Sequence, residues 1–143
     1  MGDYFVRKLD DKRRLTIPAD LRAEFESGVV LTRGFKNYLH LYPKDIWDKE
    51  VEPQLIGNIL DEVTADLNVR FRMGKIDGEI DGKQGRIAIE QHLLDWAGID
   101  REVVAVRAGK YWRLMTPSTQ SALAEATSKE IAERHAKHHQ SSL

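Results

Sequence analysis

Residues 29–43 read Val-Val-Leu-Thr-Arg-Gly-Phe-Lys-Asn-Tyr-Leu-His-Leu-Tyr-Pro, and residues 103–117 read Val-Val-Ala-Val-Arg-Ala-Gly-Lys-Tyr-Trp-Arg-Leu-Met-Thr-Pro. The two stretches align without a gap, so that Arg33 falls on Arg107. Just upstream, residues 14–17 match residues 86–89 in the same way. A repeated unit of roughly 45 residues is too small to enclose its own core. The two copies are therefore expected to pair with each other, within one chain or between chains.

Each copy is expected to contain a strand, a turn, a second strand, a short helix and a hairpin. In the first copy the strands are expected over residues 4–9, 14–17, 29–32 and 38–42, with a helix that begins at Pro18 and ends near Gly28. In the second copy they are expected over residues 74–80, 86–89, 103–106 and 112–116, with a helix that ends at Gly98. Proline is tolerated in a first helical turn, and glycine favours the left-handed position that ends a helix.

The segment between the copies is expected to be helical and interrupted. Pro53 should break a first helical stretch and bias Glu52 away from helical geometry. Apolar residues then recur at spacings of three and four, which predicts one amphipathic helix over residues 55–67. The chain is thus divided into a first repeat (4–43), a helical linker (44–73), a second repeat (74–117), and a C-terminal helix with a tail that frays over residues 140–143 (118–143).

Composition excludes several classes of protein. The chain has 143 residues, no cysteine and a formal net charge of −1. No apolar run is long enough to span a bilayer and no apolar export signal is visible, so a cytoplasmic protein is expected. No nucleophile elbow, phosphate-binding glycine loop or metalloprotease motif is present, so we expect no enzyme and no cofactor. His135, His138 and His139 lack nearby carboxylates in a fixed frame, so no metal site is expected either.

Charge is separated along the chain despite the near-zero total. Residues 7–22 contain six basic and three acidic side chains, whereas residues 44–66 contain two basic and seven acidic ones. One face could therefore attract phosphate while another repels it, although solvated basic loops are an equally good interpretation. Trp47, Trp96 and Trp112 stand at amphipathic positions and are expected to pack in the core or at an interface.

The region around the first turn resembles a known DNA-binding signature. Residues 6–22 contain a basic strand, the pattern Asp-x-x-x-Arg from Asp10 to Arg14, an apolar strand, Ile17-Pro18, and a helix with Leu-Arg. This resembles the AbrB/SpoVT-type DNA-binding domains. Two such copies joined by a helical linker resemble the MraZ family of transcriptional regulators, which is encoded at the head of the bacterial division and cell-wall gene cluster.

The resemblance implies a fold and a function. The implied fold is α+β and mainly β: a tandem swapped-hairpin β-barrel with pseudo-two-fold symmetry and flanking helices. The implied function is binding of double-stranded promoter DNA at short repeated boxes upstream of the cluster, usually with repression. It also implies a nucleoid-associated homo-oligomer, in the form of a ring of several subunits.

The resemblance also carries over to individual residues. The expected DNA-binding residues of the first copy are Arg7, Lys8, Asp10, Lys12, Arg13 and Arg14. Arg14 has the chemistry for a bidentate contact with guanine, and the neighbouring cations have the chemistry for phosphate. Asp10 is expected to cap the turn or to orient Arg14. If position 13 requires a positive φ angle, an arginine there is strained, because the family generally has glycine at this position.

The second copy departs from the pattern. Lys83 and Arg86 are its expected DNA-binding residues, but Asp81 stands five positions before Arg86 rather than four, so that Gly82 takes the expected aspartate position. This turn is expected either to contact DNA weakly or to be structural. An alternative function is an oligomeric protein-interaction module that does not bind DNA. A single-copy AbrB-like antitoxin is disfavoured by the second copy and by the length of the chain.

Overall fold

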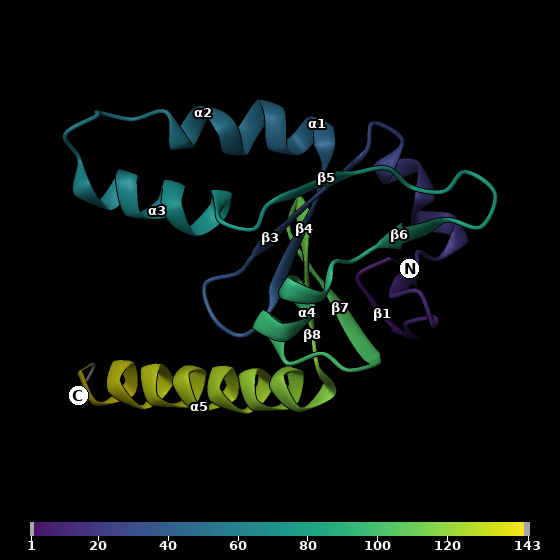
Figure 1. Ribbon diagram of the computed structural model, residues 1–143. Helices are drawn as coiled ribbons and strands as arrows, with labels where there is room; N and C mark the ends of the chain where they lie inside the picture. Colours follow the sequence, from purple (N-terminus) through teal and green to yellow (C-terminus); the bar gives the residue numbers. More distant parts are fainter. Residues whose placement is uncertain (1, 142–143) are drawn as a thin grey trace.

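The computed structural model describes residues 2–141. Two halves with the same order of strands and short helix are joined by a helical linker (Figure 1). The first half contains β1 (Tyr4–Lys8), β2 (Arg14–Thr16), the 3-10 helix η1 (Ala19–Phe25), β3 (Val29–Arg33) and β4 (Leu39–Pro43). The second half contains β5 (Ile76–Gly78), β6 (Arg86–Ala88), α4 (Gln91–Ala97), β7 (Glu102–Ala108) and β8 (Tyr111–Met115). The order of elements expected from the repeat is therefore present in both halves.

The strands interleave the two halves. Six of them form one sheet in the order β1-β7-β8-β4-β3-β5, and β2 pairs with β6 in a separate two-stranded ribbon. The first strand of each half pairs with the hairpin of the other half, because β1 lies beside β7 and β5 lies beside β3. The two hairpins meet at the middle of the sheet through β4 and β8. Corresponding strands of the two halves (β1 and β5, β7 and β3, β8 and β4) stand at equivalent positions from the two edges of the sheet, as a pseudo-two-fold axis requires.

The α+β class, mainly β and with flanking helices, is confirmed. All pairings are antiparallel. The expected barrel is not found: the pairings give an open six-stranded sheet and a separate ribbon, and no closed ring of strands forms within residues 2–141.

The core is shared between the halves. Its fully buried side chains come from the ribbon, the short helices and the inner face of the sheet, and they include Leu15 and Leu31 from the first half and Ile87, Leu93 and Trp112 from the second. The Phe5 ring of β1 lies 5.3 Å from the Trp112 ring of β8, which joins the two repeats directly. Neither half could bury these residues alone, so the apolar contribution to stability depends on the interleaved pairing.

The helix after β4 continues through Pro53, contrary to expectation. It comprises α1 (Lys44–Ile46), the π-helical turn η2 (Trp47–Val51) and α2 (Glu52–Leu55), and Glu52 has helical φ and ψ of −53° and −46°. Pro53 stands in the first turn of α2, directly after the π-helical turn, and a first helical turn tolerates the missing N–H of proline. The expectation that Pro53 interrupts the helix was therefore wrong.

The prediction of a single amphipathic helix over residues 55–67 was also wrong. The chain leaves helical geometry at Ile56 and resumes it only in α3 (Glu62–Arg72), where the Asp61 carboxylate caps the helix by accepting the Val63 N–H. Ile59 and Leu60, in the loop between α2 and α3, are 93% and 87% exposed. The apolar spacing therefore did not reflect burial in this chain.

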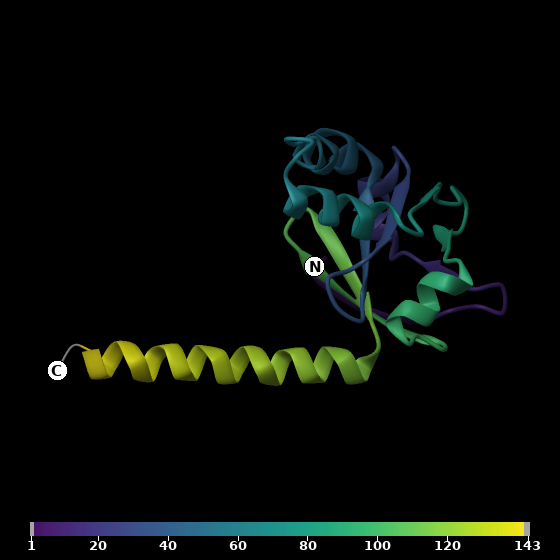
Figure 2. The same ribbon diagram turned by 60° about the vertical axis from the view of Figure 1, so that its left-hand side comes forward.

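The last helix, α5 (Pro117–Ser141), extends away from the body of the protein (Figure 2). It begins at Pro117 as expected, and its N-terminal part packs on the sheet through the half-buried Leu123, which contacts the cluster that contains Val104 of β7. Gln140 and Ser141, which were expected to fray, are helical, whereas residues 142 and 143 lie outside the described residues. Among the helices of residues 2–141, none is both long and apolar enough to cross a bilayer.

The three tryptophans were expected to pack in the core or at an interface. Trp47 and Trp112 are fully buried, and Trp96 is half-buried with its indole N–H donating to the Lys36 carbonyl. Trp47 belongs to a small second cluster under the linker helices, together with Val30, Tyr42, Leu55 and Phe71.

Candidate nucleic-acid interface

The turn between β1 and β2 is organised by the carboxylate of Asp10. One carboxylate oxygen, Oδ1, accepts the backbone N–H groups of Lys12 and Arg14, each at 2.9 Å. The other oxygen, Oδ2, lies 2.6 Å from Nε of the Arg14 guanidinium. Burial acts to raise the pKa of Asp10, but these hydrogen bonds from Arg14 and Lys12 outweigh it and hold the pKa below its usual value. The expectation that Asp10 caps the turn and orients Arg14 is confirmed.

The Arg14 guanidinium is fixed through Nε, and its two terminal nitrogens are available to bind a ligand. Asp10 engages only Nε, and within residues 2–141 neither terminal nitrogen of the guanidinium has a protein acceptor. The Arg14 side chain is 31% exposed, so these two donors lie at the surface in a fixed orientation. Two parallel N–H donors are the arrangement that guanine or a phosphate accepts.

Arg13 adopts the positive φ angle that the sequence suggested. Its φ is 58°, and it is the only residue other than glycine with a positive φ among residues 2–141. This conformation brings the Cβ of an L-residue too close to the backbone and costs about 1–2 kcal/mol. The exposed Arg13 side chain supplies a cation to the surface of the turn.

We expect Arg13→Gly to raise the free energy of unfolding by ~0.5–1 kcal/mol, because the relieved strain exceeds the added entropy of the unfolded chain. The same change should weaken DNA binding severalfold through the lost charge. Urea unfolding checks the first effect. Arg13→Ala is the matched control, since it removes the charge but keeps the strain, and equal stability of the two variants would contradict this account.

The turn between β5 and β6 repeats this design with one additional residue. Asp81 Oδ1 accepts the backbone N–H groups of Lys83 (2.9 Å) and Gln84 (3.4 Å), and Oδ2 lies 2.9 Å from Nη2 of Arg86. The hydrogen bond from Arg86, followed by those from the two backbone N–H groups, lowers the pKa of Asp81 to about 2. Asp81 thus takes the place of Asp10. The assignment of that position to Gly82 was wrong, because the extra residue lies inside the turn.

The two turns differ in how much of each arginine is available. Arg86 uses a terminal nitrogen for its aspartate, and its Nε is buried without a partner within residues 2–141. Its side chain is 22% exposed, compared with 31% for Arg14. Gly85, with a φ of 65°, takes the positive-φ position that Arg13 holds in the first turn. The second turn therefore has the same geometry with fewer free donors and less charge.

The ribbon holds the two turns at its opposite ends, because β2 and β6 are antiparallel and pair Arg14 with Ala88 and Thr16 with Arg86. Ile17 N–H donates to the Gly85 carbonyl at 2.7 Å, and Ile89 N–H donates to the Arg13 carbonyl at 3.0 Å. In both views the turns lie on the side of the molecule away from the free end of α5 and from the loop between α2 and α3 (Figures 1 and 2). The acidic linker is consequently separated from the basic turns.

The other expected residues lie around this surface. Lys12 and Lys83 are exposed at the tips of their turns. Arg7 and Lys8 are exposed near the end of β1, and because consecutive strand residues alternate they point to opposite faces. The Arg7 guanidinium lies 5.8 Å from the centroid of the Phe5 ring. The structure therefore brings Lys12, Arg13 and Arg14 together and leaves Arg7 and Lys8 farther back.

One supporting residue was missed in the sequence. Arg22 donates from Nε to the Ile17 carbonyl at 3.0 Å and packs directly against Gly85. A Cβ at Gly85 would lie 1.9 Å from Arg22 Nε and would displace that side chain, and the φ of 65° also favours glycine at this position. Within the motif, Arg22 was noted only as part of the Leu-Arg pair of the helix, and its contact with the second turn depends on the pairing of β2 with β6.

Comparisons with known proteins place this chain among similar sequences. A family model described as "MraZ protein, putative antitoxin-like" matches residues 1–66. A protein of Thermomicrobium roseum named "Transcriptional regulator MraZ" is 36% identical over 91% of this chain and 93% of its own length. Proteins with the same name from Syntrophomonas wolfei (34% identical, 93% of this chain and 94% of the relative) and Kocuria rhizophila (38% identical, 76% and 75%) are also similar.

Proposed function

Because the chain belongs to the MraZ family, we propose that it is a transcriptional regulator that binds double-stranded promoter DNA through its two turns. The observation that carries this proposal is the pair of turns in which an aspartate holds an arginine at the surface. Both turns lie on one side of the molecule (Figure 2). Arginine donors oriented in this way are suited to base edges and phosphates.

The first turn makes the main contact in this proposal. Arg14 reads a base edge or grips a phosphate with its two terminal nitrogens, and Lys12 and Arg13 add phosphate contacts from the exposed tip. Arg7 and Lys8 extend the positive surface along β1. In the second turn Lys83 and Arg86 contribute a weaker contact, because Arg86 has fewer free donors. The chain acts at repeated boxes upstream of the division and cell-wall gene cluster, and it represses that cluster.

One chain offers few DNA contacts, so the proposal includes assembly into a homo-oligomer, a ring of several subunits. Joining subunits raises the effective concentration of each turn at a neighbouring box, which increases affinity without any new kind of contact. An exposed apolar surface supports assembly. It consists of Ile56, Ile59 and Leu60, in the loop between α2 and α3. We call this surface the linker tip.

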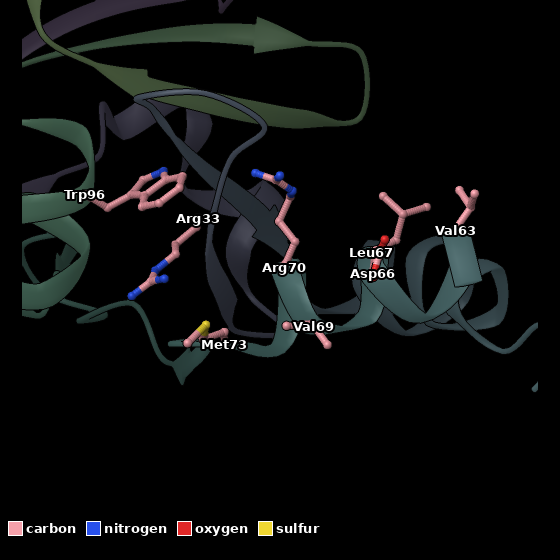
Figure 3. A pocket seen from close by; sticks show the side chains of 8 residues that line it. All are labelled: Arg33, Val63, Asp66, Leu67, Val69, Arg70, Met73 and Trp96. Atoms are coloured by element: carbon pink, nitrogen blue, oxygen red, sulfur yellow. The ribbon is translucent and has the colours of Figure 1, made fainter. Parts of the chain in front are cut away.

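A groove beside the linker tip has complementary chemistry. It has a volume of about 550 Å³, and its lining includes Val69 and Met73 of α3 and the half-buried Trp96 of α4 (Figure 3). Arg33 lies over Trp96 at 5.0 Å and Arg70 projects from α3, so the groove has two cations and the single carboxylate of Asp66. The linker tip has the acidic neighbours Asp61 and Glu62. A tip from one subunit in the groove of the next would be a head-to-tail contact, the kind of interface that forms a ring when the rotation between successive subunits closes.

We expect the double change Ile59→Asp and Leu60→Asp to dissociate this assembly, with subunit affinity lowered more than tenfold, because two apolar side chains and charge complementarity are lost together. Both positions are exposed in the single chain, so folding should be unaffected. Light scattering after size-exclusion chromatography measures the mass. Ile131→Asp, at an exposed position on α5, is the matched control. An unchanged mass for the double variant would contradict assembly through the linker tip.

The proposed function is tested by fluorescence-anisotropy titration of the full chain with the duplex found upstream of its own gene. A scrambled duplex of equal length is the control, and both are titrated at several salt concentrations. The native duplex should bind more tightly, and log K should fall linearly with log salt, because bound cations displace counterions from phosphate. Equal and weak binding of both duplexes would contradict the proposal and favour a protein-interaction module.

A further inference from the structure

The internal repeat gives two arginines equivalent places in the fold, but only one of them has counterions. Arg107 of β7 donates from Nε to the Asp3 carboxylate at 3.0 Å and from Nη2 to the Glu24 carboxylate. Arg33 aligns with Arg107 in the repeat and stands at the same position of β3. Arg107 therefore shows which partners an arginine at this position takes where the fold supplies them.

The surroundings of Arg33 lack both carboxylates. Gly74 precedes β5 at the position that Asp3 takes before β1, and a Cβ there would lie 3.7 Å from Nε of Arg33. Trp96 takes the place of Glu24, since each is the sixth residue of the seven-residue helix in its half. Within residues 2–141 Arg33 forms no ion pair, and its Nε is buried without a hydrogen-bond partner. The arginine of the first hairpin is thus left without the counterions that its counterpart has.

The guanidinium of Arg33 is nevertheless open to a partner from outside. It stands beside Trp96 at one end of the groove along α3 (Figure 3). Only Nε of this side chain is buried, so its two terminal nitrogens reach the surface, and neither has a protein acceptor in the described part of the chain. The Trp96 ring centroid lies 5.0 Å from the guanidinium carbon, a contact that holds the cation in place.

The other polar groups of the groove do not supply a counterion. Arg70 is a second cation, and it donates from Nη1 to the Phe35 carbonyl at 3.4 Å. The Trp96 indole N–H donates to the Lys36 carbonyl at 2.9 Å. Asp66 is the single carboxylate of the lining, and it forms no ion pair among residues 2–141. Two cations and one carboxylate leave the lining with a net positive charge, which an incoming carboxylate would compensate.

A carboxylate of this kind stands beside the linker tip. Asp61 uses both of its oxygens at the start of α3, where they accept the Val63 N–H and the Thr64 hydroxyl. The next residue, Glu62, is exposed, and its carboxylate has no hydrogen-bond or ion-pair partner in the part of the chain that the structure describes. Entry of the linker tip into a groove would therefore bury apolar surface and bring a carboxylate with it.

We propose that Glu62 of one subunit pairs with Arg33 of the next when the linker tip enters the groove. Glu62 then provides from outside the carboxylate that Glu24 provides to Arg107 from within. A planar guanidinium with two unpaired terminal nitrogens is suited to a carboxylate, which accepts both donors. This inference rests on the assembly that the proposed function includes, specifies its polar contact, and does not depend on DNA binding.

Charge reversal at either position should weaken assembly more than tenfold, because two like charges then meet in the contact. The variants are Glu62→Arg and Arg33→Glu, and analytical ultracentrifugation of the full chain measures the subunit affinity. Glu133→Arg, at an exposed position on α5, is the matched control and should assemble like the unchanged chain. Unchanged subunit affinity of Glu62→Arg would overturn the proposal.

Mixing the two reversed chains tests whether the contact joins different subunits. An equal mixture of Glu62→Arg and Arg33→Glu should assemble to within about threefold of the unchanged affinity, because each contact between unlike chains joins opposite charges again. Failure of the two folded variants to assemble together would overturn the proposal. If Arg33→Glu does not fold by circular dichroism, Arg33→Met replaces it. This change keeps an apolar contact with Trp96 and should lower the affinity about three- to tenfold.

Two outcomes separate this proposal from the proposed function. Dissociation by the double change Ile59→Asp and Leu60→Asp, with Glu62→Arg unaffected, would overturn the pairing with Arg33 and leave assembly through the linker tip in place. A chain that is monomeric at every concentration would overturn both the pairing and the assembly. Fluorescence anisotropy with the upstream duplex measures the DNA contact of the turns separately from either outcome.

Discussion

Arg14→Ala is expected to weaken binding to the upstream duplex at least tenfold, the largest effect of any single change in the turns. A bidentate arginine contact contributes about 1–3 kcal/mol, and each 1.4 kcal/mol corresponds to a factor of ten in Kd. The variant also leaves the Asp10 carboxylate without its cation, so that a negative charge then faces phosphate. In an assembly the loss recurs in every subunit, which increases the effect further.

The fold of the turn should survive this change. Asp10 still accepts the backbone N–H groups of Lys12 and residue 14, which hold the backbone independently of the guanidinium. Fluorescence anisotropy with the upstream duplex measures the loss. Arg14→Lys should bind with intermediate affinity, because it restores the charge without the two parallel donors. Arg134→Ala, on α5, is the control for loss of an exposed arginine. If Arg14→Ala bound the duplex as tightly as Arg134→Ala does, the role of Arg14 would be contradicted.

Trp112→Ala is expected to lower the free energy of unfolding by about 3–5 kcal/mol, a large part of the ~5–15 kcal/mol that stabilises a typical domain. Trp112 is fully buried and contacts both repeats. Its ring packs on Phe5 of β1, its indole N–H donates to Glu24 at 3.1 Å, and the Arg107 guanidinium lies 4.5 Å from its ring centroid. The cavity left by alanine would open at the junction of the interleaved halves.

Urea unfolding of Trp112→Ala, followed by circular dichroism, gives this free energy. Trp96→Ala is the matched control, because Trp96 is half-buried and has one hydrogen bond and one cation contact. Its cost should be smaller, about 1–2 kcal/mol. If the two variants were equally stable, packing across the repeats would not be the main source of stability.

The interleaved architecture could be anticipated from the repeat. A hairpin such as residues 29–43 has too few partners to bury Leu31 and Leu41, so a second copy had to complete the sheet. The partner of each strand required more information. The family resemblance implied that hairpins are swapped between the repeats, but it did not assign the pairing of β1 with β7, and nothing in residues 4–8 indicates which hairpin they join.

The linker was predicted less well, for a definable reason. Apolar spacing identifies a helix only when the apolar side chains face the core, whereas Ile56, Ile59 and Leu60 face solvent. Gly57 and Asn58 interrupt the pattern, and Asn58 Oδ1 accepts the Leu60 N–H in the loop. Capping chemistry was the better signal here, because an aspartate before a helical run, Asp61, marked the true start of α3.

The second turn and the surroundings of Arg33 show two further limits of the sequence. A one-residue insertion shifted the apparent register, so Asp81 looked misplaced although its contacts match those of Asp10. Arg33 looked equivalent to Arg107, on which it aligns. The carboxylates around Arg107 come from other elements, whereas Arg33 meets Trp96 once α4 packs beside β3, so the difference appears only in the folded chain.

Hydrogen-exchange mass spectrometry of the full chain, with and without the upstream duplex, tests the central claim most directly. Peptides that cover residues 7–14 and 81–86 should exchange more slowly in the presence of that duplex, with the larger protection in the first turn, while those of the distal part of α5 remain unchanged. A scrambled duplex should give weaker protection. Protection confined to the linker helices or α5, with both turns unaffected, would contradict DNA binding through the paired turns.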